Sequence, residues 1–353
     1  MKKLLTKFGV TKFISAAVLL AVSPLSIAED YDAVADEQKF NQFVVELRAE
    51  ALDKGYSASL VEKAFADVKF KPKIIKADRN QPEFVETLET YLPKRVPDWK
   101  VERARAKYKE HKELLDKIGA DYGVQPRFIV ALWGLESNFG KIQGNDPVIS
   151  SLVTLSYDGR RGAFFKRQLW DALDIVQTGQ APFEKLKGSW AGAMGQAQFI
   201  PSSFKAYAVD YDKDGIKDIW SNPADVFASA ANYLKSEGWN DNLTWGRQVK
   251  VPADFDFDLA IPKSTNGRSH WLKKWKETEV DLATWQARGV RRMDGSDLPN
   301  VNLKAAMLIP DGKKGRVYLA YDNYKVLMHW NRSYYFVTTV GYLADRIGYP
   351  AVK

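Results

Sequence analysis

Apolar residues recur at helical spacing through the first part of the chain. Between about Asp36 and Lys117, segments such as FNQFVVELRAEALDKG and SASLVEKAFADV predict amphipathic helices. Gly55 is expected to end one helix and Ser57 to begin the next. Residues 70–99 contain four prolines and predict an irregular connector with a short helix inside it. The stretch WKVERARAKYKEHKELLDKIGADYG predicts a long charged helix with a solvated face.

The segment 126–140, PRFIVALWGLESNFG, places a carboxylate in line with an apolar stripe. Three apolar residues lie three, four and seven positions before Glu136: Trp133, Leu132 and Ile129. Proline suits the first helical position and glycine the stop, so the helix should end just past Glu136. Burial on that face would raise the pKa of the carboxyl group, as a general acid requires. The alternative is a helix-end glutamate that faces solvent.

From about Leu243 the pattern changes to strands and turns. TWGRQVKVP, FDFDLAI, NVNLKAAMLIP and GRVYLAYD predict strands, and PDGKKG at 310–315 predicts a hairpin. SHWLKKWKE and DLATWQARG predict short helices between them, and residues 324–348 predict a closing helix that packs on the central block. The fold class expected is α+β, mainly α. The expected divisions are 1–28, 29–118, 119–242, 243–330 and 331–353.

Residues 1–28 have the pattern of a secretory signal peptide. Four lysines precede the apolar run ISAAVLLAV, and small residues follow at Ser26 and Ala28. The apolar run is too short to span a bilayer. The chain contains no cysteine, so neither a lipid anchor at the cleavage site nor a disulfide is expected. We therefore expect an exported, soluble protein of a bacterial periplasm.

Charge and composition exclude several classes of function. The net charge of +8 falls to +4 without the four signal-peptide lysines, and no basic stripe indicates nucleic-acid binding. The three histidines show no metal-ligand spacing, and no cysteine nucleophile, G-x-S-x-G elbow or phosphate-binding glycine loop is present. Carboxylate chemistry at Glu136, and so glycoside cleavage, is the enzymatic class that remains.

Glycosidases ordinarily use two carboxylates about 5–10 Å apart. Asp146 and Asp158 are the candidates for a second acid here, and neither has a persuasive setting. One well-placed acid in an exported protein points to a substrate that supplies its own nucleophile. Peptidoglycan can do so, because its N-acetyl group can assist departure and its muramic C6 hydroxyl can then attack.

Two further segments between 155 and 204 offer candidate ligand-binding groups. Arg160 and Arg161 stand at the start of a predicted helix, where cations are mildly unfavourable, and can hold a ligand carboxylate or a buried acid. A local salt bridge is an equal alternative. The glycine-rich segment GSWAGAMGQAQFIPSSF indicates close backbone approach. Its Ser189 and Gln198 suit hydrogen bonding to a sugar or its acetamido group. Tight helix packing is the alternative that the segment favours without further context.

The segment 210–218, DYDKDGIKD, has the spacing of an EF-hand-type calcium loop. Carboxylates stand at positions one, three, five and nine with a glycine at six: Asp210, Asp212, Asp214, Asp218 and Gly215. Position twelve departs from the pattern, because Ser221 replaces the bidentate glutamate, and Asp225 can supply that ligand instead. The alternative assigns Asp225 to the start of a helix that Asn222 caps.

Five segments in order resemble one known family, the lytic murein transglycosylases of the B type (glycoside hydrolase family 103). They are GLESNFG (134–140), LSYDGRR (155–161), GSWAGAMGQAQFIPSS (188–203), AVDYDKDGIKDIWSNPADVFASAANYL (208–234) and YKVLMHWNRS (324–333). The resemblance implies a lysozyme-like helical core, an N-terminal helical domain and a small β subdomain. It also implies non-hydrolytic cleavage of the β-1,4 bond between N-acetylmuramic acid and N-acetylglucosamine, which leaves a 1,6-anhydro-muramyl end.

The resemblance also assigns residues. Glu136 would be the sole catalytic acid and then base. Substrate contacts would come from Tyr91, Arg160, Arg161, Ser189, Gln198, Phe199 and Asn331. Structural calcium would be held by Asp210, Asp212, Asp214, Asp225 and the Ile216 carbonyl. Trp330 and Phe336 depart from the family pattern, which has tyrosine at both positions.

The expected partners are peptidoglycan strands and other cell-wall enzymes, with no organic cofactor and a monomeric state. Two other functions stay open: a hydrolytic muramidase, and a non-catalytic, calcium-stabilised protein that binds the wall.

Overall fold

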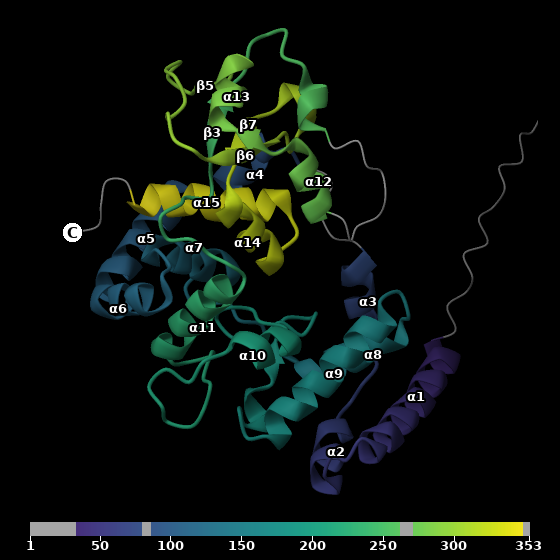
Figure 1. Cartoon of the computed structure of the whole chain (residues 1–353). Helices are drawn as coiled ribbons and strands as arrows, with labels where there is room; N and C mark the ends of the chain where they lie inside the picture. The colour runs from purple at the N-terminus through teal and green to yellow at the C-terminus, as the bar shows by residue number, and fades with distance from the viewer. Residues whose placement is uncertain (1–32, 80–85, 262–270, 349–353) are drawn as a thin grey trace, which may run out of the picture.

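The computed structural model describes residues 33–79, 86–261 and 271–348, so the predicted signal peptide at 1–28 lies outside the described residues. Helices dominate, and a small antiparallel sheet lies at one end of the molecule, as Figure 1 shows. The expected mainly helical α+β class is therefore confirmed. The first six helices are α1 (Ala33–Asp53), α2 (Ala58–Phe65), α3 (Pro72–Arg79), α4 (Leu88–Arg95), α5 (Asp98–Glu110) and α6 (Lys112–Tyr122).

These first helices largely follow the sequence pattern. Ser57 caps α2 as predicted, since its hydroxyl accepts a hydrogen bond from the Leu60 amide at 3.3 Å. The expectation of a single helix within 70–99 was wrong, because the proline-rich connector holds both α3 and α4. The single long charged helix was also wrong. His111 leaves helical geometry (φ −110°, ψ 22°) and separates α5 from α6.

The next helices build the centre of the molecule. They are α7 (Pro126–Ser137), α8 (Val148–Tyr157), α9 (Gly162–Gln177), α10 (Pro201–Tyr207) and α11 (Pro223–Ser236). Helix α7 starts at Pro126 and ends just past Glu136, as predicted. Its stop comes earlier than Gly140, because Asn138 (φ 50°) and Phe139 (φ 60°) already adopt the left-handed conformation. Two consecutive non-glycine residues in that region are strained.

A five-stranded antiparallel sheet follows. Its strands are β3 (Gly246–Lys250), β4 (Val280–Asp281), β5 (Arg291–Arg292), β6 (Lys304–Leu308) and β7 (Val317–Ala320), in the order β4-β6-β7-β3-β5. The predicted hairpin around 310–315 is confirmed by the pairing of β6 with β7. The strand predicted at FDFDLAI was wrong: Asp256 accepts a hydrogen bond from the Asp258 amide at 3.0 Å and starts a 3-10 turn, Phe257–Ala260.

Short helices connect the strands, and two helices close the chain. They are α12 (Trp271–Thr278), α13 (Leu282–Ala287), α14 (Asp322–Trp330) and α15 (Tyr334–Gly348). Helix α15 packs against α7. The expectation of a single closing helix over 324–348 was wrong, because the chain leaves helical geometry after Trp330 and forms α14 and α15. A separate two-stranded pairing joins β1 (Asp146–Pro147) to β2 (Lys187–Gly188).

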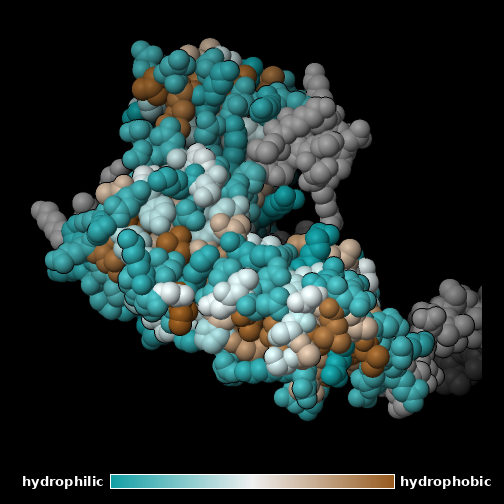
Figure 2. Space-filling view, turned by 60° about the horizontal axis from the view of Figure 1, so that its bottom comes forward, coloured by the Kyte–Doolittle hydropathy of each residue, from teal (hydrophilic) through white to brown (hydrophobic). Residues whose placement is uncertain are grey.

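Three clusters of buried apolar residues hold these elements together. The first joins α4–α7, α11, α14, α15 and one face of the sheet, the second joins α1–α3 with α8–α10, and the third lies on the other face of the sheet. Trp330 is partly buried and packs against both of the first two clusters. One lobe contains the sheet, and another contains α1, α8 and α9 (Figure 1). The space-filling view shows a hollow between the upper and lower parts of the molecule (Figure 2).

We find no helix of sufficient length and apolarity to cross a membrane in residues 33–79, 86–261 and 271–348.

Candidate active site

Glu136 occupies the last turn of α7, and its side chain is half-buried. Its Oε1 accepts a hydrogen bond of 2.7 Å from the Trp330 indole, which comes from the end of α14. Burial raises the pKa of Glu136 to about 7, although the Trp330 hydrogen bond favours the charged form and opposes that rise. The side chain is therefore not simply directed into solvent, and the group can hold a proton near neutral pH.

No second carboxylate acts on Glu136 in the described part of the chain. Among the described residues, no charged neighbour contributes to the raised pKa of Glu136. The two candidates for a second acid are occupied elsewhere. Asp146 pairs with Lys71 at 3.0 Å, and Asp158 pairs with Arg79 at 2.5 Å. Glu136 is thus a solitary acid, as the sequence analysis expected.

Aromatic rings form the wall behind Glu136. The Trp330 ring lies 5.3 Å from the Phe199 ring and 4.8 Å from the Tyr233 ring, measured between centroids. Phe199 is 2% exposed, so it supports the wall and offers little surface to a ligand. Asn331 follows Trp330 directly and is the C-cap of α14. Phe199 is therefore connected to Glu136 through the Trp330 ring, and Asn331 is connected to it only as the next residue in the chain.

The glycine-rich loop beside this wall presents two polar groups. Gln198 adopts a left-handed conformation (φ 51°), and its Nε2 donates to the carbonyls of Gln143 (3.0 Å) and Gly195 (2.9 Å). Its Oε1 accepts no hydrogen bond from the described residues. Ser189 Oγ accepts from the Ala193 amide at 3.1 Å and keeps its own proton available.

The loop's glycines serve packing between protein segments. A Cβ on Gly188 would lie 2.1 Å from the Ala193 carbonyl oxygen, and one on Gly195 would lie 2.6 Å from the Ile219 carbonyl oxygen. No larger residue fits at either position, so the close backbone approach predicted here is to other parts of the chain. The tight-packing alternative is therefore correct for these two glycines.

The arginine pair is held by a buried acid that the sequence analysis did not identify. Asp78 on α3 is 2% exposed and accepts from Arg160 Nε at 2.8 Å and from Arg161 Nη2. The local salt-bridge alternative therefore holds. Both arginine side chains nevertheless remain nearly half exposed, at 47% and 42%. No interaction in the described residues ties this pair directly to Glu136.

Tyr91 lies on α4 and is 5% exposed. Its ring contacts the Tyr335 ring edge-on at 5.4 Å, and the Arg95 guanidinium lies 5.0 Å from its centroid. Phe336, one of the two departures from the family pattern, is partly buried against the first core cluster. The side-chain hydrogen bond to Glu136 comes from Trp330 and not from either of these residues.

The acidic loop forms a compact cluster of carboxylates. Oxygens from Asp210, Asp212 and Asp214 lie within 4.8 Å of one another. Backbone amides hold them in place: the Gly215 amide donates to Asp210 at 2.8 Å, and the Ile216 amide donates to Asp214 at 2.8 Å. This set of convergent carboxylate oxygens is the donor chemistry that calcium requires, so the residues present fit that ion.

The two other acids of this region brace the loop. Asp225 is fully buried and accepts from the Tyr211 and Asp218 amides, each at 2.7 Å. Burial raises the pKa of Asp225, and these two hydrogen bonds oppose the rise. Asp218 accepts from the Ser221 amide at 2.9 Å and from its hydroxyl. Asn222 caps α11 as predicted, accepting from the Ala224 amide at 3.0 Å.

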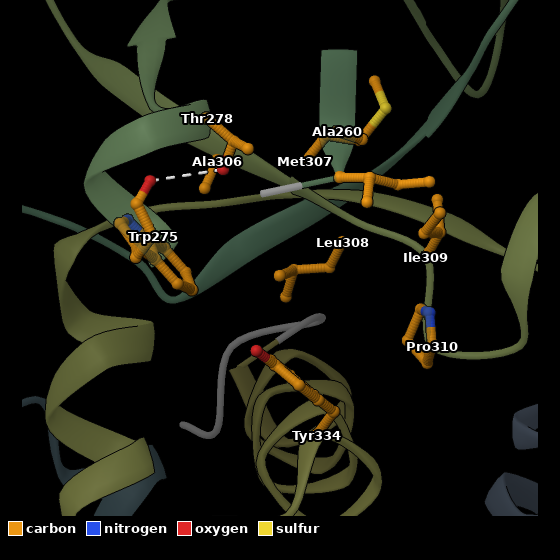
Figure 3. A pocket seen from close by; sticks show the side chains of 10 residues that line it. Ala260, Trp275, Thr278, Ala306, Met307, Leu308, Ile309, Pro310 and Tyr334 are labelled. Atoms are coloured by element: carbon orange, nitrogen blue, oxygen red, sulfur yellow. Dashed lines mark hydrogen bonds between the residues drawn. The ribbon is translucent and has the colours of Figure 1, made fainter. Parts of the chain in front are cut away.

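A cavity of about 400 Å³ lies between β6, α12 and the start of α15. Figure 3 shows Trp275, Leu308 and Tyr334 turned toward this space. None of the candidate site residues lines it. This cavity is therefore separate from Glu136 and the aromatic rings around it.

The chain is similar to proteins of known family and structure. Residues 39–345 match the family model described as "Transglycosylase SLT domain". The chain belongs to this family. It is 29% identical over 247 residues to the membrane-bound lytic murein transglycosylase B of Escherichia coli (strain K12), an alignment that spans 70% of this chain and 63% of that protein.

Solved structures of transglycosylase SLT domain proteins share the fold. SltB3 of Pseudomonas aeruginosa, in complex with NAG-anhNAM-pentapeptide, superposes with a TM-score of 0.80 at 39% identity, covering 89% of this chain and 80% of that chain. The soluble lytic transglycosylase SltB1 of P. aeruginosa gives 0.72 at 30% identity, covering 88% and 99%. Escherichia coli Slt35, in complex with calcium, gives 0.71 at 25% identity, covering 91% and 96%.

Proposed function

We propose that the chain is a lytic transglycosylase that cleaves peptidoglycan strands with Glu136 as its only catalytic carboxyl group. The observation that carries the proposal is the setting of Glu136: a half-buried, solitary acid whose pKa is raised to about 7. Membership of the transglycosylase SLT domain family and the peptidoglycan fragment named in the SltB3 complex support it.

In the proposed reaction, protonated Glu136 donates its proton to the oxygen of the β-1,4 bond between N-acetylmuramic acid and N-acetylglucosamine. The C–O bond breaks, assisted by the N-acetyl group. The muramic C6 hydroxyl then attacks C1, and the Glu136 carboxylate takes the hydroxyl proton. Acid and base are the same residue, no water is consumed, and a 1,6-anhydro-muramyl end results. A solitary carboxyl suits this sequence, since a second carboxylate would be needed only as nucleophile or to activate water.

The remaining candidate residues receive proposed roles in binding the glycan. Gln198 Oε1 and the Ser189 hydroxyl have hydrogen-bonding capacity left over and would contact sugar hydroxyl or acetamido groups. Asn331 would do the same from the end of α14. Arg160 and Arg161 keep exposed guanidinium surface for muramyl or peptide carboxylates. Tyr91 and Phe199 are buried, so their rings would act mainly by holding the neighbouring substrate-binding groups in place.

We propose further that the loop 210–218 holds a structural calcium ion. Asp210, Asp212 and Asp214 would supply carboxylate oxygens, and the Ile216 carbonyl and Asp225 are further candidates. The calcium complex of Slt35 supports the choice of ion. Calcium would neutralise the convergent acids of the loop, while the chemistry at Glu136 proceeds without it.

For the chain as a whole, we propose export to the periplasm through a signal peptide at 1–28. We propose an N-terminal helical domain (29–118), a lysozyme-like core (119–242), a small β subdomain (243–330) and a returning helix (331–353). We also propose that the protein is a monomer.

The deciding experiment is digestion of purified sacculi followed by mass spectrometry of the released products. We expect muropeptides with an anhydro end, one water lighter than hydrolysed products, and no release by Glu136→Gln. Reducing muramyl ends alone would identify a muramidase. Binding to sacculi without any release would identify a wall-binding protein.

A further inference from the structure

The hydrogen bond between Trp330 and Glu136 joins α14 to α7 across 194 residues of chain. It occupies one oxygen of the carboxyl group, Oε1, at 2.7 Å. The other oxygen, Oε2, accepts no hydrogen bond from the described residues. The buried polar atoms left without a partner in the described chain are Asn138 Oδ1, Gln143 Oε1 and Ser151 Oγ. Glu136 Oε2 is not among them, so it keeps access to solvent.

The two oxygens of Glu136 therefore differ, and the indole nitrogen determines which of them can carry the proton. The indole nitrogen donates and never accepts, so Oε1 must act as an acceptor in both protonation states of Glu136. A proton on Oε1 would turn that oxygen into a hydroxyl, which is a weaker acceptor for the indole N–H than a carbonyl oxygen. We propose that Trp330 is a positioning residue that reserves Oε1 as an acceptor and thereby assigns the transferable proton of Glu136 to Oε2. This inference rests on the proposed function for its catalytic meaning, but the assignment itself concerns the free protein.

The packing around Trp330 fixes the donor. The indole ring packs against Phe199 and Tyr233, whose own rings lie 5.9 Å apart, and against two core clusters, so its N–H direction is set by the fold. The Tyr233 hydroxyl donates to the His329 carbonyl at 2.8 Å, which ties α11 to the same turn of α14.

Several titratable groups lie close to Trp330, and any test has to distinguish their effects on Trp330 from the effect of Glu136. His329 precedes it and pairs at 3.1 Å with Glu237, the C-cap of α11. The Tyr207 hydroxyl of α10 donates to Glu237. Arg332 lies two residues on and acts electrostatically on Tyr233. Of these groups, His329 is the one exchanged in the control below, because it lies next to Trp330 in the chain and is paired with Glu237.

The direct test follows the indole N–H signals of protein labelled with 15N-tryptophan. The chain has 11 tryptophans, and the Trp330 signal is identified by its loss in Trp330→Phe. We expect this signal to shift with a midpoint near pH 7 and to stop shifting in Glu136→Gln. His329→Gln serves as the matched control and should leave the titration in place. A Trp330 signal that does not titrate, or that titrates unchanged in Glu136→Gln, would overturn the assignment.

Activity then tests the catalytic meaning. Trp330→Phe keeps an aromatic ring and removes the donor. Trp330→Tyr supplies a hydroxyl in place of the indole N–H, and a hydroxyl both donates and accepts. We expect kcat on a soluble peptidoglycan fragment to fall about 10- to 100-fold in Trp330→Phe, since misplacing a reacting group by about 1 Å can cost about 100-fold. The alkaline limb of the pH profile should move to higher pH, because loss of the donor raises the pKa of Glu136. Trp330→Tyr should recover part of both effects.

Trp285→Phe is the control for loss of a buried indole donor. Its N–H donates to the Ala305 carbonyl at 2.8 Å in the β-sheet lobe, so it should lose stability but keep the pH profile of the parent. An unshifted profile in Trp330→Phe would reduce Trp330 to a packing residue. Titration of the Trp330 signal in a protein that releases no muropeptides would instead refute the proposed function and leave the assignment intact.

Discussion

Carboxylates occupy two opposite environments in this molecule. Glu136 is half-buried and solitary, and one neutral donor reaches it. Asp210, Asp212 and Asp214 lie on a loop, gathered within 4.8 Å of one another and held by backbone amides. Burial without a cation turns a carboxyl group into an acid that keeps its proton near neutral pH. Gathering several carboxylates around backbone donors instead prepares a site for a cation. The same functional group is thus fitted to two tasks by its surroundings.

The largest expected effect tests the first environment. Glu136→Gln keeps the shape of the side chain and the Trp330 hydrogen bond but cannot deliver a proton. We expect release of muropeptides to fall by about 100- to 10,000-fold, the usual contribution of general acid–base catalysis. Release rates from sacculi measure the effect, with the circular dichroism spectrum as the control for folding. Activity close to that of the parent would remove Glu136 from its role.

Much of this first environment could be predicted from local pattern. Helical spacing placed Glu136 on the apolar face of α7, and the proline at its start and its expected end were both correct. The caps at Ser57 and Asn222 and the β6–β7 hairpin were also local signals. Each depends on residues within a few positions of one another, where the rules of secondary structure apply.

The missed contacts of the candidate site join distant segments. Asp78 meets the arginine pair from more than 80 residues away, and Trp330 meets Glu136 from 194 residues away. No periodicity connects such positions, and Trp330 attracted notice only as a departure from the family pattern. The strand predicted at FDFDLAI failed for a local reason, since the Asp256 side chain competes with strand pairing by capping a turn.

The next effect concerns the free energy of unfolding. Glu136→Gln should increase it at high pH, although most substitutions decrease it. The pKa of Glu136 is raised from 4.5 to about 7, so between these values the folded protein binds a proton that the unfolded chain has lost. Stability should therefore fall as pH rises through this window, by on the order of 3 kcal/mol in total. Glu136→Gln lacks this charge. It should be more stable than the parent near pH 8 and equal to it near pH 4, as urea unfolding can measure. Equal stability at both values would contradict the raised pKa.

Asp225 tests how the second environment is built. Its two oxygens accept from the Tyr211 and Asp218 amides, and its side chain is fully buried. Asp225→Asn turns an amide NH₂ toward one of these donors, so we expect a loss of about 2 kcal/mol in the free energy of unfolding. The matched control is Asp241→Asn, an exposed acid in the turn that follows α11, which should stay within about 0.5 kcal/mol of the parent. Similar losses in both variants would show that Asp225 does not brace the loop.

Calcium should have the smallest effect, because the loop lacks a strong ligand at its twelfth position. Ser221 stands there and bonds to Asp218, so neither supplies the bidentate carboxylate of a tight site. We expect a Kd of about 10⁻⁴–10⁻³ M, typical of extracellular calcium modules. A tenfold excess over Kd would then stabilise the fold by about 1.4 kcal/mol. Melting with chelator, calcium and magnesium measures this. Calcium alone should raise the Tm, since magnesium demands a stricter octahedral geometry. Asp212→Asn should abolish the rise, and an equal response to both metals would mean general screening of charge in place of a site.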